Sequence, residues 1–287
     1  MSDNSDIYDD PRALQAYLED EANPFHHDPS IEDVNTPLWR EVFWPSEYFE
    51  LLCSATYRGR GVPHGNGEPV LVIPGFLAND VMMLPLRRWL KRIGYRTYSA
   101  NIYWNTDCPD KTATSLAHKA RAIHRKTGHK VRLVGHSLGG MLAKSVLYRA
   151  PDVIGGVITL GSPFRDHVRA HPAVTGVWQY LINGQGELVG RNLTTSCSSG
   201  YCMCDFVRHM LQPESQPVPQ FAIYSRVDGV VDWESCIEED PAANSEIEGA
   251  THIGLIYNKR ALSALAQRLS QITAEKAAET EKGNAPV

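Results

Sequence analysis

Short apolar runs alternate with longer amphipathic stretches along most of the chain. The apolar runs predict strands at 70–73, 96–102, 131–134, 153–160, 219–224 and, more weakly, 245–248. The amphipathic stretches predict helices at 79–93, 111–126, 138–149 and 258–274. Alternation of this kind is typical of βαβ units. We therefore expect an α/β fold with a doubly wound, mostly parallel sheet of about six strands.

The first 65 residues precede this alternation and have a different pattern. Segments around 11–20 and 46–57 predict helices, and the polar, proline-bearing stretch 23–37 separates them. We expect residues 1–65 to form an N-terminal helical arm that packs on the main domain.

The main domain is expected to span 66–274. One connection inside it, from about 162 to 218, is too long to be a plain loop in a compact domain. We interpret this insertion as a cap over the carboxyl edge of the sheet. The last residues, 275–287, are rich in Ala, Glu and Lys, and we expect them to form a flexible tail.

Composition narrows the class of protein. The 287 residues are 43% hydrophobic, which is enough for a large core. The 28 Lys and Arg against 33 Asp and Glu, with no basic stripe among aromatic residues, argue against a nucleic-acid partner. No apolar run approaches the ~18 residues of a transmembrane helix, and the start MSDNSDIYDD is acidic where a signal peptide is basic. The expectation is a soluble, cytoplasmic protein, and nothing in the sequence indicates its oligomeric state.

The six cysteines do not form the pattern of a disulfide scaffold in a chain of this length. Three of them, Cys197, Cys202 and Cys204, lie in the Ser- and Gly-rich stretch TTSCSSGYCMC. This cluster fits a loop with one disulfide or a group of free thiols. Zinc binding is disfavoured because the paired C-x-x-C of structural zinc modules is missing, so no metal is expected.

One pentapeptide points to chemistry. Gly135-His136-Ser137-Leu138-Gly139 follows a predicted strand and opens a predicted helix. A serine between glycines at a strand-to-helix turn is the pattern of a nucleophile elbow, because small residues allow the tight turn that exposes the serine. The alternative is an ordinary buried serine in a turn. For His136, we expect a hydrogen bond that supports the elbow.

A serine hydroxyl needs a base within hydrogen-bond reach and a third group that orients the base. Asp228 begins the loop after the fifth predicted strand, and His252 lies between the sixth strand and the last helix. Ligands bind beyond the carboxyl ends of strands in doubly wound folds, so these positions suit catalysis. Asp232 is a rival for the acid, and His252 has the alternative of a capping or core residue.

Four motifs in this order resemble the α/β-hydrolase superfamily, and within it cofactor-free serine esterases and lipases. They are IPGF at 73–76, GHSLGG at 135–140, YSRVDGVVDW at 224–233 and THIGL at 251–255. The resemblance spans roughly residues 68–272, whereas the arm and the cap match no motif we can name. Many relatives have His-Gly where this chain has Pro-Gly in the first motif, a variant also found among lipases.

The resemblance implies a carboxylic ester hydrolase that forms an acyl-enzyme with Ser137, Asp228 and His252 and needs no cofactor. It also implies an oxyanion hole formed by the backbone N–H groups of Leu138 and Phe76, with Leu77 as the fallback. The expected substrate is a small-molecule or lipid ester. An acyltransferase or thioesterase with the same triad is the alternative, and a non-catalytic binding protein is the least favoured.

Residues near the expected mouth of the site are candidates for substrate contact. They are Leu77 after the first strand, Trp104 after the second and Phe164 after the fourth. Apolar side chains there suit the acyl or alcohol part of an ester. Simple packing against the cap is the competing interpretation, and for Trp104 the two are even.

Overall fold

The computed structural model describes residues 34–165, 169–174, 176–177, 204–211, 216 and 218–283. The helix expected at 11–20 and most of the 162–218 insertion lie outside these residues, as do Cys197 and Cys202 of the cysteine cluster.

The sheet has six strands, all parallel, in the order β2-β1-β3-β4-β5-β6. Its strands are β1 (Pro69–Ile73), β2 (Arg96–Tyr98), β3 (Val131–His136), β4 (Ile154–Leu160), β5 (Gln220–Tyr224) and β6 (Asn244–Glu246). The central strands β1 and β3 are buried along their whole length, as expected where helices cover both faces. The α/β class and the parallel six-stranded sheet are thus confirmed.

The strand order reverses between β1 and β3. From β1 the chain first adds β2 on one side, then returns to add β3 and the later strands on the other. Adjacent connections therefore leave the sheet on opposite faces, which opens a crevice at the carboxyl ends of β1 and β3. The IPGF and GHSLGG motifs begin at the carboxyl ends of these two strands, so the fold brings them to the same crevice.

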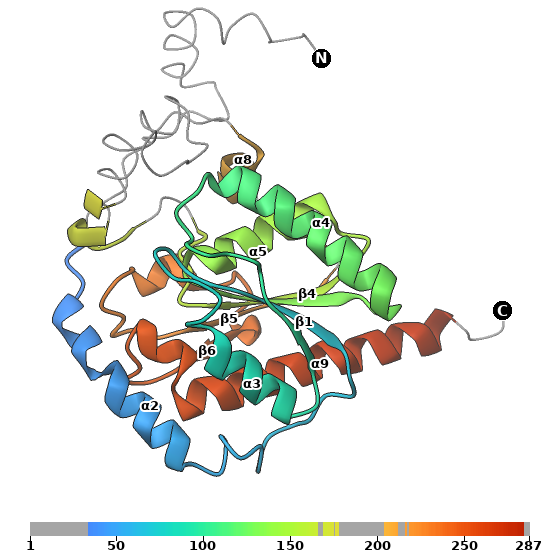
Figure 1. Cartoon of the computed structure of the whole chain (residues 1–287), viewed down its shortest axis with the longest axis horizontal. Helices are drawn as coiled ribbons and strands as arrows, with labels where there is room; N and C mark the ends of the chain where they lie inside the picture. The colour runs from blue at the N-terminus through green and yellow to red at the C-terminus, as the bar shows by residue number, and fades with distance from the viewer. Residues whose placement is uncertain are drawn as a thin grey trace, which may run out of the picture.

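Helices cover both faces of the sheet (Figure 1). The α-helices are α2 (Trp44–Cys53), α3 (Leu84–Arg92), α4 (Pro109–Thr127), α5 (Leu138–Arg149), α8 (Asp205–Leu211) and α9 (Lys259–Gly283). Apolar side chains of α4, α5 and α8 pack on one face in one core cluster, and those of α2, α3 and α9 pack on the other. The described residues also form the 3-10 helices η2 (Leu38–Phe43), η3 (Trp233–Cys236), η4 (Pro241–Ala243) and η5 (Ile253–Ile256).

The second strand is shorter than the sequence predicts, because the residues after Tyr98 donate their hydrogen bonds to an aspartate side chain and not to a neighbouring strand. The carboxylate of Asp80 accepts hydrogen bonds from the N–H groups of Ala100 (2.9 Å) and Ile102 (3.0 Å). Asn101 between them has a φ of 64°, which a strand does not allow. The predicted strand at 96–102 therefore ends at Tyr98.

The described part of the arm, residues 34–65, lies against the main domain (Figure 1). Leu51 of α2 belongs to the core cluster that α3 and α9 form. The indole Nε1 of Trp89 in α3 donates to the carbonyl of Thr56 over 2.7 Å.

From the insertion, α8 packs on α5, where the ring of His209 stacks on that of Tyr148 with 4.6 Å between the ring centroids. Among the described residues, no helix is both long and apolar enough to cross a membrane.

Candidate active site

Ser137 is the single residue between β3 and α5, and its backbone is strained. Its φ of 52° and ψ of −126° lie in a region that residues other than glycine rarely adopt. Its N–H donates to the carbonyl of Leu160 over 2.9 Å, which ties the turn to the end of β4. Such strain, persisting in a well-packed core, is a feature of functional sites.

The loop after β1 runs directly past this turn. A Cβ on Gly75 would lie 3.0 Å from the Ser137 Cβ and 3.1 Å from Nδ1 of His136, so glycine permits the close approach. Leu138 is the first residue of α5, so its N–H has no carbonyl of that helix to bond. The N–H of Leu77 donates to the carbonyl of Asn105 over 3.3 Å.

Asn105 supports the same loop, and sequence reasoning gave it no role. Its buried side chain donates from Nδ2 to the carbonyl of Pro74 over 2.8 Å. Its backbone N–H donates to the carbonyl of Ala78 over 2.9 Å, in addition to the bond from Leu77. Asn105 alone thus makes three hydrogen bonds between the loop after β1 and the segment after β2.

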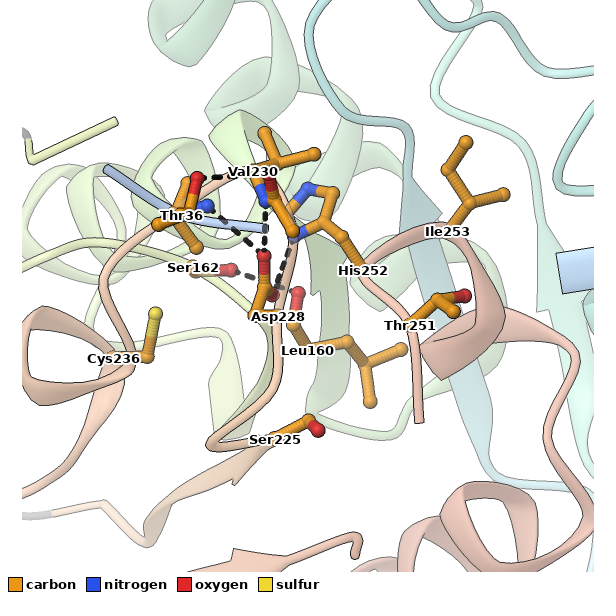
Figure 2. Close-up of polar contacts among 12 residues, drawn as sticks. Thr36, Leu160, Ser162, Ser225, Asp228, Val230, Cys236, Thr251, His252 and Ile253 are labelled. Atoms are coloured by element: carbon orange, nitrogen blue, oxygen red, sulfur yellow. Dashed lines mark hydrogen bonds and ion pairs between the residues drawn. The ribbon is translucent and has the colours of Figure 1, made fainter. Parts of the chain in front are cut away.

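Asp228 and His252 are joined in the buried interior (Figure 2). Oδ2 of Asp228 lies 2.7 Å from Nδ1 of His252. Oδ1 of Asp228 accepts from the N–H groups of Val230 (2.8 Å) and Val231 (2.9 Å), so the carboxylate orientation is fixed. Because an ionised carboxylate only accepts, the proton of the imidazole sits on Nδ1 and Nε2 is left as the basic nitrogen.

The rival acid, Asp232, faces another partner. Its Oδ2 pairs with Nη1 of Arg169 at 2.7 Å, and its Oδ1 accepts from the N–H of Glu234 at the start of η3. The structure therefore brings Asp228, rather than Asp232, to His252.

His136 links the elbow to the histidine loop, residues 251–255. Its Nε2 donates to the carbonyl oxygen of His252 over 3.0 Å, and the two ring centroids are 4.8 Å apart. Burial, together with the positive charge that His252 can carry, lowers the pKa of His136 to about 3, despite that hydrogen bond. His136 is therefore neutral at physiological pH. The hydrogen bond that we expected from its side chain is made to the backbone of the histidine loop.

The pKa of His252 shifts in the other direction. Burial lowers the pKa, but the negative charge of Asp228, its hydrogen bond and the negative charge of Glu41 together raise it above the ordinary value. The imidazolium form of His252 is thus stabilised by two carboxylates.

The candidate substrate contacts differ in exposure. The side chains of Leu77 and Trp104 are 42% and 50% exposed, and Trp104 meets Tyr103 edge to face. Phe164 is only 8% exposed, and Nζ of Lys144 lies 3.9 Å from the centre of its ring. Among the described residues, no group of three or more His, Cys, Asp or Glu side chains is placed to bind a metal ion.

Two solved structures share this architecture. The mature form of the Bacillus licheniformis lipase BlEst2 aligns with a TM-score of 0.51 at 18% identity, covering 74% of this chain and 94% of the lipase. A structure from work on LipS and LipT, two metagenome-derived lipolytic enzymes, aligns with a TM-score of 0.52 at 17% identity. The alignment covers 74% of this chain and 96% of that one. The chain has an α/β-hydrolase fold.

Sequence comparisons match the middle of the chain. The family model of the PGAP1-like alpha/beta domain matches residues 110–186, which include the elbow. Two proteins named triacylglycerol lipase, from Pseudarthrobacter phenanthrenivorans and Burkholderia plantarii, are each 29% identical over 106 residues. Each match covers 34% of this chain, together with 33% of the first lipase and 30% of the second. The chain therefore spans about one third of the length of these curated relatives.

Two carboxylates of the arm also reach the candidate site, and sequence reasoning missed both. Glu41 of η2 accepts from the backbone N–H groups of Gly229, His252 and Ile253. Glu47 of α2 accepts from the N–H of Thr251 over 3.0 Å. No sequence signal marks these residues, because acidic side chains in a helical segment usually form a solvated face.

Proposed function

We propose that this protein is a carboxylic ester hydrolase of the esterase or lipase type, with Ser137 as nucleophile, His252 as base and Asp228 as acid. One observation carries the proposal: the buried Asp228–His252 pair adjoins the strained elbow through the hydrogen bond from His136 to His252. The likeness to proteins named lipases and the order of the four motifs support the same reaction class.

In the first half of the reaction, the Ser137 hydroxyl attacks the ester carbonyl carbon while Nε2 of His252 takes its proton. Asp228 keeps the other imidazole proton on Nδ1 and stabilises the imidazolium. The tetrahedral intermediate then collapses, His252 returns the proton to the departing alcohol oxygen, and the acyl group remains on Ser137.

The intermediate carries a negative charge on the former carbonyl oxygen. We propose the N–H groups of Leu138 and Phe76 as the donors to this oxygen, since the close approach at Gly75 brings their two loops together. A side-chain donor of this kind lowers the activation barrier by about 2.7–4 kcal/mol in a serine protease.

In the second half, a water molecule attacks the acyl-enzyme and His252 takes its proton. The acid leaves as Ser137 regains its own proton, so the two halves use the same base. The mechanism needs only residues of this chain, the ester and water.

For substrate contact we propose the exposed side chains of Leu77 and Trp104. Phe164 stays a weaker proposal, because Lys144 covers one face of its ring. Replacing Trp104 by alanine should raise KM for a long acyl ester more than for an acetate ester, since the indole adds apolar contact only along a longer chain. A series of p-nitrophenyl esters from acetate to palmitate measures this.

The direct test of the function is hydrolysis of p-nitrophenyl butyrate by wild type and Ser137→Ala. The variant should lose nearly all turnover, whereas the control Ser46→Ala, at an exposed serine that bonds the Phe43 carbonyl, should keep it. Retention of wild-type turnover by Ser137→Ala would remove Ser137 from the mechanism.

A second measurement tests the base. A fluorophosphonate probe should label Ser137 in the wild type and should label it far more slowly in His252→Ala, because the hydroxyl then lacks a proton acceptor. Labelling of His252→Ala at the wild-type rate would contradict the role of the histidine.

A further inference from the structure

Glu41 is a buried carboxylate that accepts three hydrogen bonds from backbone N–H groups far away along the chain. It lies on η2 in the arm and is 9% exposed. Its Oε1 accepts from the N–H groups of His252 (2.8 Å) and Gly229 (3.0 Å), and its Oε2 accepts from the N–H of Ile253 (2.9 Å). Three charge-assisted bonds satisfy a carboxylate that would otherwise be costly to bury.

The three donors belong to two loops. These are the acid loop, residues 224–233, which carries Asp228, and the histidine loop, which carries His252. Gly229 directly follows Asp228, and the other two donors are His252 itself and its neighbour Ile253. These loops are separated from Glu41 by 188 and 211 residues along the chain. One side chain of the arm therefore connects both partners of the Asp228–His252 hydrogen bond.

A second residue of the arm contacts the acid loop beside Glu41. The hydroxyl of Thr36 donates to the carbonyl of Gly229 over 2.8 Å, close to Asp228 (Figure 2). A Cβ on Gly229 would lie 2.7 Å from Oε1 of Glu41 and 2.9 Å from the carbonyl oxygen of Pro37, so only glycine leaves room for the arm. The arm thus bonds both the N–H and the C=O of the residue after Asp228.

We propose that Glu41 is a positioning residue of the active site, which fixes the acid loop and the histidine loop relative to each other through their backbones. The proposal rests on the hydrolase mechanism given above. Glu41 bonds the backbone N–H groups of these loops, so it acts through His252 and Asp228.

Glu41 also has an electrostatic effect that a neutral support would lack. The charged and titratable groups packed around His252 are Asp228 of the acid loop, Glu41 of η2, His136 of β3 and Glu47 of α2. Of these, Asp228 and Glu41 raise the pKa of His252, and His136 stays neutral. A negative charge at Glu41 therefore favours the imidazolium that forms when His252 takes the proton of Ser137.

The test compares Glu41→Gln with Glu47→Gln in the full-length protein. Glutamine keeps the size of Glu41 and one acceptor oxygen, but it loses the charge and turns an amide N–H towards at least one backbone N–H donor. Glu47 is the control for the charge effect alone, because it also bonds the histidine loop, at the N–H of Thr251, but is not among the groups that shift the pKa of His252.

We expect Glu41→Gln to lower kcat by at least about tenfold, as small misplacements of catalytic groups do, with little change in KM. The acid limb of its kcat/KM profile should move to lower pH, whereas the limb of Glu47→Gln should stay at the wild-type pH. An unmoved acid limb in Glu41→Gln, or an equal shift in both variants, would overturn the proposal.

Two further measurements keep the proposal testable under other outcomes. The pH titration of the His252 imidazole by NMR, in wild type and Glu41→Gln, needs no substrate, so it distinguishes failure of this proposal from failure of the proposed function. If Glu41→Gln does not fold, Thr36→Val removes only the bond to Gly229 and should lower kcat several-fold without moving the acid limb. An unchanged kcat in Thr36→Val would then refute the positioning role of the arm.

Discussion

Replacement of Asp228 by asparagine tests the orientation of the base most sharply. Oδ1 of Asp228 accepts from the N–H groups of Val230 and Val231, so the amide oxygen of an asparagine must take that side. The amide NH₂ would then occupy the place of Oδ2, which lies 2.7 Å from Nδ1 of His252. Because NH₂ only donates, Nδ1 must become the acceptor and the imidazole proton must move to Nε2.

The size of the effect follows from this change of tautomer. With its proton on Nε2, His252 cannot accept the proton of Ser137 without first breaking the new hydrogen bond. The same substitution in a serine protease with this triad lowers kcat about 10⁴-fold. At about 1.36 kcal/mol for each factor of ten, Asp228→Asn should raise the activation barrier by roughly 5.5 kcal/mol.

The assay is turnover of p-nitrophenyl butyrate, with a circular dichroism melt to check the fold. Asp232→Asn is the matched control, since its carboxylate pairs with a partly exposed Arg169 and such pairs contribute about 1 kcal/mol or less to folding. Asp232→Asn should have a slightly lower melting temperature and should hydrolyse p-nitrophenyl butyrate at close to the wild-type rate. Equal losses of turnover in the two variants, or a larger loss in Asp232→Asn, would refute the assignment of the acid.

Three other changes probe the oxyanion loop and the base. Gly75→Ala should lower kcat by about tenfold or more with little change in KM, because its Cβ would lie 3.0 Å from the Ser137 Cβ and displace the loop; a wild-type kcat would contradict this. Asn105→Ala leaves the carbonyl of Pro74 without its donor and should reduce the free energy of unfolding by about 1–3 kcal/mol in a urea titration, with a fall in kcat; unchanged stability would contradict it. Since the pKa of His252 is raised and the base must be neutral, kcat/KM should fall on the acid side with a midpoint above 6.5, the ordinary value; a midpoint below 6.5 would contradict it.

The core of the fold is predictable because its strands are buried on both faces. The mainly apolar runs at 70–73 and 131–134 became β1 and β3, two neighbouring interior strands of the sheet. The ends of elements were less accurate, because side chains took over backbone hydrogen bonds. Asn79, where a helix was expected to begin, instead accepts from the N–H groups of Val81 and Met82, and α3 begins only at Leu84.

The proximity of Asp228 and His252 was predictable for a related reason. Both follow strands of one parallel sheet, and the carboxyl ends of such strands share an edge. Asn105 lies beyond the second strand at the same edge, but its role depends on a bond to a backbone carbonyl, which any residue type presents. Hydrophobic pattern and motif spacing give no information about such bonds.

The same reasoning explains why Glu41 escapes prediction and why it matters. The N–H groups of residues 251–254 lie just before η5 or in its first turn, so they have no carbonyl of that helix to bond. Thr251 supplies the one local acceptor, with its hydroxyl bonded to the N–H of Gly254 at 2.9 Å. The other three N–H groups are satisfied by Glu47 and Glu41, and each would cost about 1–3 kcal/mol if left buried without a partner. The histidine loop therefore lacks sufficient caps of its own, so its folded conformation, and with it the position of His252, depends on two carboxylates from the start of the chain.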